Sequence, residues 1–262
     1  NAQAALGVAE RGYVLSEGRI TLSVSAAELS SSGDMRKLFL REIEETAMPA
    51  PVSIESKPAV LEQGLKPEPI LQIRGLHRTF GGLVAVNNLS IDVQRHQFLG
   101  VIGPNGAGKT TLLNLITGYL QPSAGEIYLN GKRIDGLKPY DVCVRGVGRT
   151  FQLVQCFPEM SVIDNVITGA LFAREARISL DEARERVRRP LELVGLDRKT
   201  DVLAGTLALG EQKKLELARA LATQPQLLLL DEVMAGSPHE DVVELMAVLR
   251  AIHAAGTTIV MI

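Results

Sequence analysis

Apolar residues are grouped along this chain in two ways. Three short runs are apolar without interruption: residues 98–102 (FLGVI), 227–230 (LLLL) and 258–262 (TIVMI). Strands that are covered on both faces of a parallel sheet show this pattern. Elsewhere apolar residues recur at a helical spacing, most clearly over residues 180–194 and 211–223. Strand runs that alternate with helical stretches predict an α/β fold with an inserted helical region.

The N-terminal part has a different pattern. Residues 1–45 predict a hairpin of two short strands, 13–15 and 19–24, around the turn Ser16-Glu17-Gly18, with helical stretches at 2–9, 26–29 and 34–45. A piece of this size cannot bury a sufficient core alone, so we expect it to dock onto another part. Residues 46–70 hold five of the 12 prolines and predict a linker. The larger block is residues 71–262.

Composition narrows the class of protein. Of the 262 residues, 46% are hydrophobic and 22% are charged, and the net charge is −2. These are globular values without the basic excess of a nucleic-acid binder. Cys143 and Cys156 form no disulfide framework, no His/Cys cluster has metal-ligand spacing, and no apolar run reaches the ~20 residues of a membrane span. We therefore expect a soluble protein in a reducing, cytosolic setting, which reaches a membrane only through a partner.

Residues 103–110 read GPNGAGKT and match the phosphate-binding pattern G-x-x-x-x-G-K-[ST] between a strand and a helix. Glycines let the backbone N–H groups form an anion nest, to which the helix N-terminus adds partial positive charge. A lysine and a hydroxyl here suit the phosphates and Mg²⁺. The predicted nucleotide contacts are Gly103, Pro104, Asn105, Gly106, Ala107, Gly108, Lys109, Thr110 and Thr111.

The LLLL run ends in Asp231-Glu232. Ligands of open α/β sheets bind at the carboxyl ends of the strands. We expect Asp231 to hold the water shell of Mg²⁺ and Glu232 to polarise the attacking water. Taken alone, such a pair would more often cap helices or make surface contacts, and it is the phosphate loop upstream that favours the catalytic interpretation.

Between these two motifs, residues 207–212 read LALGEQ and resemble the signature of ATP-binding-cassette (ABC) ATPases, LSGGQ. Only two of the five positions match outright, and 21 residues separate the glycine from Asp231. In the family this loop and its helix N-terminus face the γ-phosphate on a partner ATPase, so that two nucleotides are sandwiched in a dimer. The five aligned residues are Leu207, Ala208, Leu209, Gly210 and Glu211.

The resemblance implies further roles. Gln152, in GRTFQ, takes the position that contacts Mg²⁺ and water and couples to the membrane subunit. Phe80, in HRTFGG, fits the aromatic that stacks on adenine, although a core aromatic is the alternative. Residues 153–217 correspond to the family's helical subdomain. The implied fold is a P-loop NTPase core with an antiparallel β portion, and the implied cofactors are ATP and Mg²⁺.

Within the family, GGLVAVNNLSIDV, GRTFQLVQCFPEMSVIDNV and LLLLDEVMAG look like ATP-binding subunits of branched-chain amino acid importers. Residues 1–45 look like the C-terminal segment of the sister ATPase, as in a fusion of two cassettes. The implied partners are a second ABC ATPase subunit, membrane permease subunits and, indirectly, a periplasmic binding protein, but no nucleic acid. The implied place is the cytoplasmic face of the inner membrane.

Other interpretations stay open. The family's switch histidine follows the strand that here reaches Ile262, the last residue of this sequence. A nucleotide-binding module that does not hydrolyse ATP is therefore an alternative. Importer ATPases for urea or amides read very similarly. A cassette ATPase acting on DNA or ribosomes is disfavoured by the near-neutral charge.

Overall fold

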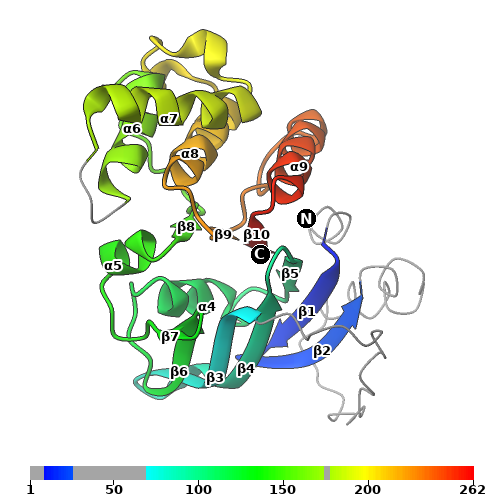
Figure 1. Cartoon of the computed structure of the whole chain (residues 1–262). Coiled ribbons are helices and arrows are strands. Elements are labelled where there is room, and N and C mark those ends of the chain that lie inside the picture. The colour runs from blue at the N-terminus through cyan, green and yellow to red at the C-terminus, as the bar shows by residue number, and fades with distance from the viewer. Residues whose placement is uncertain (1–8, 26–68, 174–177) are drawn as a thin grey trace, which may run out of the picture.

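The computed structural model describes residues 9–25, 69–173 and 178–262. Two sheets and several helices make up this part of the chain, and one group of helices lies at the end opposite the antiparallel sheet (Figure 1). The helical stretches predicted at 26–29 and 34–45, almost all of the one at 2–9, and nearly all of the linker lie outside the described residues.

The central sheet has the strand order β2-β1-β5-β10-β9-β8. Its parallel part contains the three runs that the sequence predicted, and all residues of the strands β5, β9 and β10 that they form are buried, although Ile262, at the end of the third run, is only partly buried. Apolar clusters cover both faces of the sheet, since successive residues of one strand, such as Leu228 and Leu229, belong to different clusters. The strands are β1 (Arg11–Ser16), β2 (Arg19–Ser25), β5 (Phe98–Ile102), β8 (Val147–Arg149), β9 (Leu227–Leu230) and β10 (Thr258–Met261).

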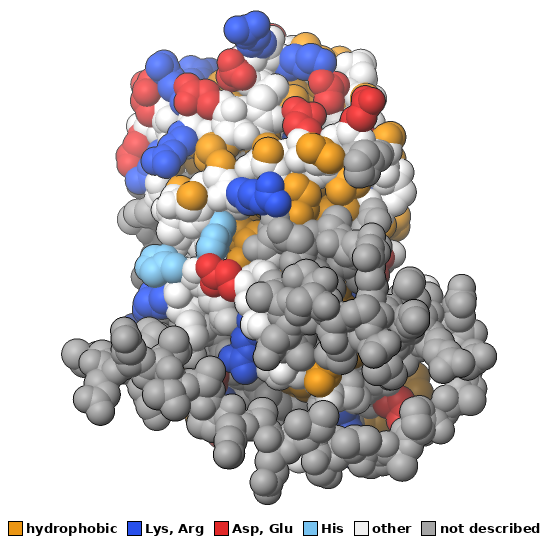
Figure 2. Space-filling view, turned by 90° about the vertical axis from the view of Figure 1, so that its right-hand side faces the viewer, with side chains coloured by type: hydrophobic (Ala, Val, Ile, Leu, Met, Phe, Trp, Pro, Cys, Tyr) orange, Lys and Arg blue, Asp and Glu red, His pale blue; other side chains and the backbone are white. Residues whose placement is uncertain are grey.

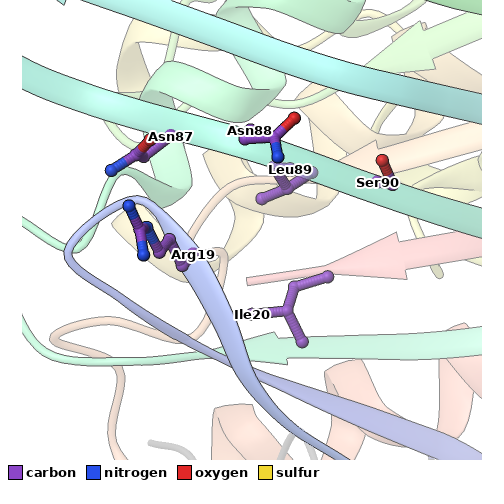
Figure 3. Close-up of a pocket in the computed structure, with 6 residues that line it drawn as sticks. All are labelled: Arg19, Ile20, Asn87, Asn88, Leu89 and Ser90. Atoms are coloured by element: carbon purple, nitrogen blue, oxygen red, sulfur yellow. The ribbon is translucent and has the colours of Figure 1, made fainter. Parts of the chain in front are cut away.

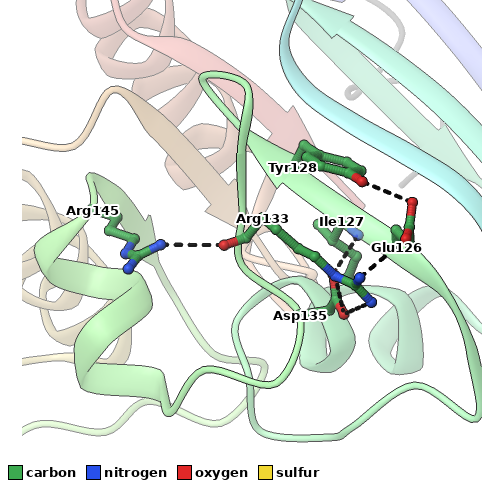
Figure 4. Close-up of polar contacts among 6 residues, drawn as sticks. All are labelled: Glu126, Ile127, Tyr128, Arg133, Asp135 and Arg145. Atoms are coloured by element: carbon green, nitrogen blue, oxygen red, sulfur yellow. Dashed lines mark hydrogen bonds and ion pairs between the residues drawn. The ribbon is translucent and has the colours of Figure 1, made fainter.

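The second sheet is antiparallel, in the order β4-β3-β6-β7. It comprises β3 (Pro69–Phe80), β4 (Leu83–Gln94), β6 (Ala124–Leu129) and β7 (Lys132–Arg133). Figure 4 shows how polar side chains tie its β6–β7 end together, with Arg133 bonded to both Asp135 and Glu126 and the Tyr128 hydroxyl donating to Glu126. This sheet is the antiparallel β portion that the family resemblance implied.

The remaining elements are helical. Helices α6 (Val162–Phe172), α7 (Leu180–Leu193) and α8 (Leu209–Ala222) pack together at the end shown uppermost in Figure 1. They share a core that includes Val166, Val187 and Leu215, and the Ser161 and Ser179 hydroxyls cap the first two helices. The predicted limits of the helical subdomain, 153–217, stay a prediction, although α8 itself continues to Ala222. The other helical elements are α4 (Lys109–Ile116), α5 (Pro139–Val144), α9 (His239–Ala254), η1 (Asp197–Lys199) and η2 (Ala204–Thr206).

The N-terminal hairpin lies beside the phosphate loop. β1 pairs with β2 in antiparallel fashion and with β5 in parallel, so the predicted hairpin docks on the central sheet. In its turn, the Gly18 N–H donates to the Ala107 carbonyl (3.0 Å), and the Gly18 carbonyl accepts from Asn87. Gly18 has φ +74°, and a Cβ there would lie 2.7 Å from the Ala85 carbonyl oxygen, so only glycine fits. The predicted domain limits at 45 and 70 stay a prediction.

A hollow of about 390 Å³ lies between this hairpin and β4 (Figure 3). Its described lining comes from β2 and β4: Arg19, Ile20, Asn87, Asn88, Leu89 and Ser90. None of these is a predicted site residue, so the hollow is separate from the candidate site.

Figure 2 shows charged side chains of both signs on one face of the molecule. There, over the helical end, Lys and Arg side chains alternate with Asp and Glu and form no basic stripe. None of the helices in the described ranges is both long and apolar enough to cross a membrane.

Candidate nucleotide-binding site

The phosphate loop connects β5 to α4, as the sequence predicted. Gly106 and Gly108 have φ of +82° and +99°, a left-handed conformation that favours glycine. Close backbone contacts add a second requirement, since a Cβ on Gly108 would lie 2.2 Å from the Ala85 carbonyl oxygen and one on Gly103 would lie 2.1 Å from that of Leu15. The backbones of β4 and the N-terminal hairpin therefore pack directly against the phosphate loop at these two glycines.

Lys109 begins α4 and folds back over the loop. Its Nζ donates to the carbonyls of Gly103 (2.8 Å) and Pro104 (3.0 Å). Burial lowers the pKa of this ammonium group, and the negative charges of Glu232 and Asp231 act against that. A cation at the mouth of a nest of backbone N–H groups suits a polyphosphate.

The acidic pair follows β9 directly. Asp231 is 1% exposed, and its Oδ1 accepts from the Thr110 hydroxyl at 3.4 Å. Glu232 has the left-handed φ of +48°, which is uncommon for a non-glycine residue, and its Oε2 accepts from Gln152 Nε2 at 3.0 Å. β5, β8 and β9 are parallel strands of one sheet, so their carboxyl ends bring together Thr110, Gln152, Asp231 and Glu232.

This donor set fits a hard cation. Hydroxyl, amide and carboxylate oxygens are the ligands that Mg²⁺ prefers, usually together with phosphate oxygens and water. Thr110, Gln152 and Asp231 would hold Mg²⁺ here, with Lys109 and the loop N–H groups on the phosphate side.

The five signature residues lie at the start of α8. Leu207 is buried, Ala208 is the N-cap and Leu209 begins the helix with its side chain 58% exposed. Gly210 packs against the Asp241 carboxylate, and Glu211 pairs with Lys199 at 2.5 Å. Within the described part of the chain, no hydrogen bond or ion pair joins these five residues to the phosphate loop.

The N-cap of α8 is incomplete. The Glu211 carboxylate reaches back to the Ala208 N–H, but alanine has no side-chain oxygen to accept from the N–H groups of the first turn. We predict that Ala208→Ser raises the free energy of unfolding by about 1 kcal/mol. Urea denaturation of the two proteins measures the difference, and an unchanged midpoint would contradict the prediction.

Phe80 ends β3, is 41% exposed, and lies under the Arg78 guanidinium, 4.6 Å from the ring centroid. The core-aromatic alternative is therefore wrong. Stacking on adenine stays a prediction.

Sequence reasoning missed two charged residues beside the site, Arg149 and Glu216. Arg149 stands in GRTFQ, which we used only to place Gln152, and it forms a buried ion pair with Asp231 (2.8 Å). Glu216 stands in the apolar face of α8 and accepts from the Phe151 N–H at 3.2 Å. A charged residue among positions that otherwise face the core was the signal available in both cases.

Glu216 should make stability depend on pH. The carboxyl is 3% exposed, and burial raises its pKa from 4.5 to about 7, against the effect of its hydrogen bond from Phe151. The folded state therefore holds a proton that the unfolded state releases, so stability falls as pH rises from about 4.5 to about 7. The loss is on the order of 3 kcal/mol, at roughly 1.4 kcal/mol per pKa unit.

Unfolding by urea across that pH range, in wild type and Glu216→Gln, isolates this group from other carboxyls. The difference between the two curves should grow steadily from pH 4.5 to 7. Parallel curves would show that Glu216 does not titrate there.

The phosphate loop, the strand-end acids and the parallel sheet together define a P-loop nucleoside triphosphatase. Residues 86–235 match the ABC transporter family, and the chain belongs to that family. The chain is 40% identical to the high-affinity branched-chain amino acid transport ATP-binding protein LivG of Salmonella typhimurium, over 74% of this chain and 82% of that protein. It is 43% identical to BraF of Pseudomonas aeruginosa, which carries the same description, over 71% of this chain and 78% of that protein.

Solved structures agree on the fold. The ADP conformation of MJ1267, an ATP-binding cassette of an ABC transporter, has a TM-score of 0.67 and 32% identity, over 74% of this chain and 80% of that one. A dimeric post-hydrolysis cassette, MJ0796 bound to ADP and Pi, has a TM-score of 0.65 at 24% identity, which supports the fold alone.

Proposed function

We propose that this chain is the ATP-binding subunit of an importer of branched-chain amino acids, and that it hydrolyses ATP to drive uptake. The observation that carries the proposal is the meeting of Thr110, Gln152, Asp231 and Glu232 beside the phosphate loop. The importer assignment rests on the similarity to LivG and BraF.

Each residue has a role in the proposed reaction. The loop N–H groups and Lys109 bind the β- and γ-phosphates, and Thr110 orients the γ-phosphate side of the site. Glu232, held by Gln152, accepts a proton from the attacking water. The oxygen of that water bonds to the γ-phosphorus while the bond from the γ-phosphorus to the bridging oxygen breaks, and ADP leaves. Mg²⁺ bound by Thr110, Gln152 and Asp231 would neutralise charge on the phosphates.

The partners are part of the proposal. A second ABC ATPase subunit would cover the phosphate loop with its own signature residues, because Leu207–Glu211 of this chain do not reach its own loop. Membrane permease subunits, fed by a periplasmic binding protein, would carry the amino acid. The chain would then lie on the cytoplasmic face of the membrane.

Reconstitution tests the proposal. The chain is assembled in proteoliposomes with permease subunits, a sister ATPase and a binding protein from an importer of this class, and uptake of labelled leucine is measured with ATP inside. We expect uptake that requires ATP and is matched by phosphate release. ATP binding without phosphate release would favour the non-hydrolysing module, and uptake of urea or amides in place of leucine would change the substrate class.

A further inference from the structure

Arg149 ends β8 with a side chain that is only 6% exposed. Its Nη2 donates to Oδ2 of Asp231 at 2.8 Å, and the Asp231 side chain is 1% exposed. The pair joins two residues that are 82 positions apart in the sequence. Arg149 therefore engages Oδ2 of Asp231, while Oδ1 accepts the hydrogen bond from the Thr110 hydroxyl.

The guanidinium group is fixed from several sides. Nη1 donates to Asn114 Oδ1 (2.7 Å) on α4 and to Thr117 Oγ1 (3.0 Å) at the end of that helix. The rings of Phe151 and Tyr119 lie 4.9 Å and 5.8 Å away. Nε of Arg149 has no partner among the described residues, so the hydrogen bonds of the guanidinium group all come from Nη1 and Nη2. α4, which begins in the phosphate loop, therefore sets where Arg149 stands.

Both acids of the site are held by one short segment. Arg149 binds Asp231, and Gln152, three residues later, binds Glu232. The orientation of the acidic pair thus depends on the place of residues 149–152, and Arg149 is the part of that segment anchored to α4.

We propose that Arg149 is a positioning residue for Asp231: it turns one carboxylate oxygen toward Thr110 and so builds the Mg²⁺ half of the nucleotide site. This rests on the function proposed above, in which Asp231 and Thr110 hold Mg²⁺ with ATP.

Charge alone argues against placing an arginine here. A guanidinium group beside a metal-binding carboxylate repels the cation, and desolvating a buried ion pair costs free energy that the pair does not reliably recover. The orientation that Arg149 gives to Asp231 offsets this repulsion and desolvation cost, since partners that hold a metal-binding group typically raise metal affinity by about 10- to 100-fold. Lysine would offer a compact point charge in place of the planar guanidinium fork with which Arg149 donates to α4 and to Asp231 from separate nitrogens.

The test is the gain in nucleotide affinity on adding Mg²⁺. Binding of the fluorescent analogue MANT-ADP to the full chain is titrated in EDTA and in saturating Mg²⁺, and the ratio of the two dissociation constants is compared between variants. The variants are Arg149→Met, Arg149→Lys and Asn114→Leu, of which the last keeps the charge but removes an anchor. Arg133→Met, which removes a half-exposed arginine and its two ion pairs, with Glu126 and Asp135, in the β6–β7 region (Figure 4), is the matched control.

We expect Arg149→Met to reduce the Mg²⁺-dependent gain by about 10- to 100-fold, with binding in EDTA unchanged. Arg149→Lys and Asn114→Leu should reduce the gain partially, and Arg133→Met should leave it intact. A purely structural role would lower the melting temperature without changing the ratio, and this would overturn the proposal, as would a larger gain in Arg149→Met.

If Arg149→Met does not fold, the Lys and Asn114 variants decide by the same ratio: a reduced gain supports positioning, and an unchanged gain overturns it. Failure of the wild-type chain to bind MANT-ADP at all would instead count against the proposed function. The two failures are therefore distinguishable.

Discussion

Glu232→Gln is expected to lower the rate of ATP hydrolysis by about 10²- to 10⁴-fold, the usual contribution of a general base, while ATP binding is retained. Glutamine has nearly the same shape and can still bond to Gln152, but it cannot accept a proton from water. Phosphate release measures the rate, and size-exclusion chromatography with ATP should show a trapped dimer in the assembled ATPase pair.

The matched control is Glu244→Gln. Glu244 is an exposed acid of α9 that pairs with Lys214 at 2.6 Å. Its replacement should leave turnover unchanged. If Glu232→Gln hydrolyses ATP at the wild-type rate, the assignment of Glu232 as the base is wrong.

Lys109→Ala is expected to weaken ATP binding by roughly 2–4 kcal/mol, or about 30- to 1,000-fold, because it removes charge-assisted hydrogen bonds to two phosphates. Equilibrium dialysis with labelled ATP measures this. In the same variant the carbonyls of Gly103 and Pro104 lose their donor, so melting curves without nucleotide should accompany the binding data.

Lys132→Ala serves as the comparison, since Lys132 lies exposed on β7. It should bind ATP like the wild type. An unaltered affinity in Lys109→Ala, with Lys132→Ala also normal, would show that the loop does not bind phosphate through this lysine.

Several features of this protein are determined by its sequence alone. The three buried strands, the phosphate loop and the acidic pair were predicted because each is encoded within a few adjacent residues: an apolar run, a glycine pattern, a strand end. Parallel strands end at one edge of a sheet, so the meeting of Lys109 with Asp231 and Glu232 followed from these local patterns. The N-terminal hairpin was also predicted, though not the edge on which it docks.

Tertiary structure decided the rest. The pairing of β1 with β5, the support of the phosphate loop by Gly18, and the ion pair between Arg149 and Asp231 all join residues between about 80 and 90 positions apart. No periodicity or motif records such contacts, because a charged residue inside an apolar segment has the same local signature whether its partner lies on the next turn or on another strand. Only the packing of β8 against β9 and α4 makes Arg149 part of the nucleotide site.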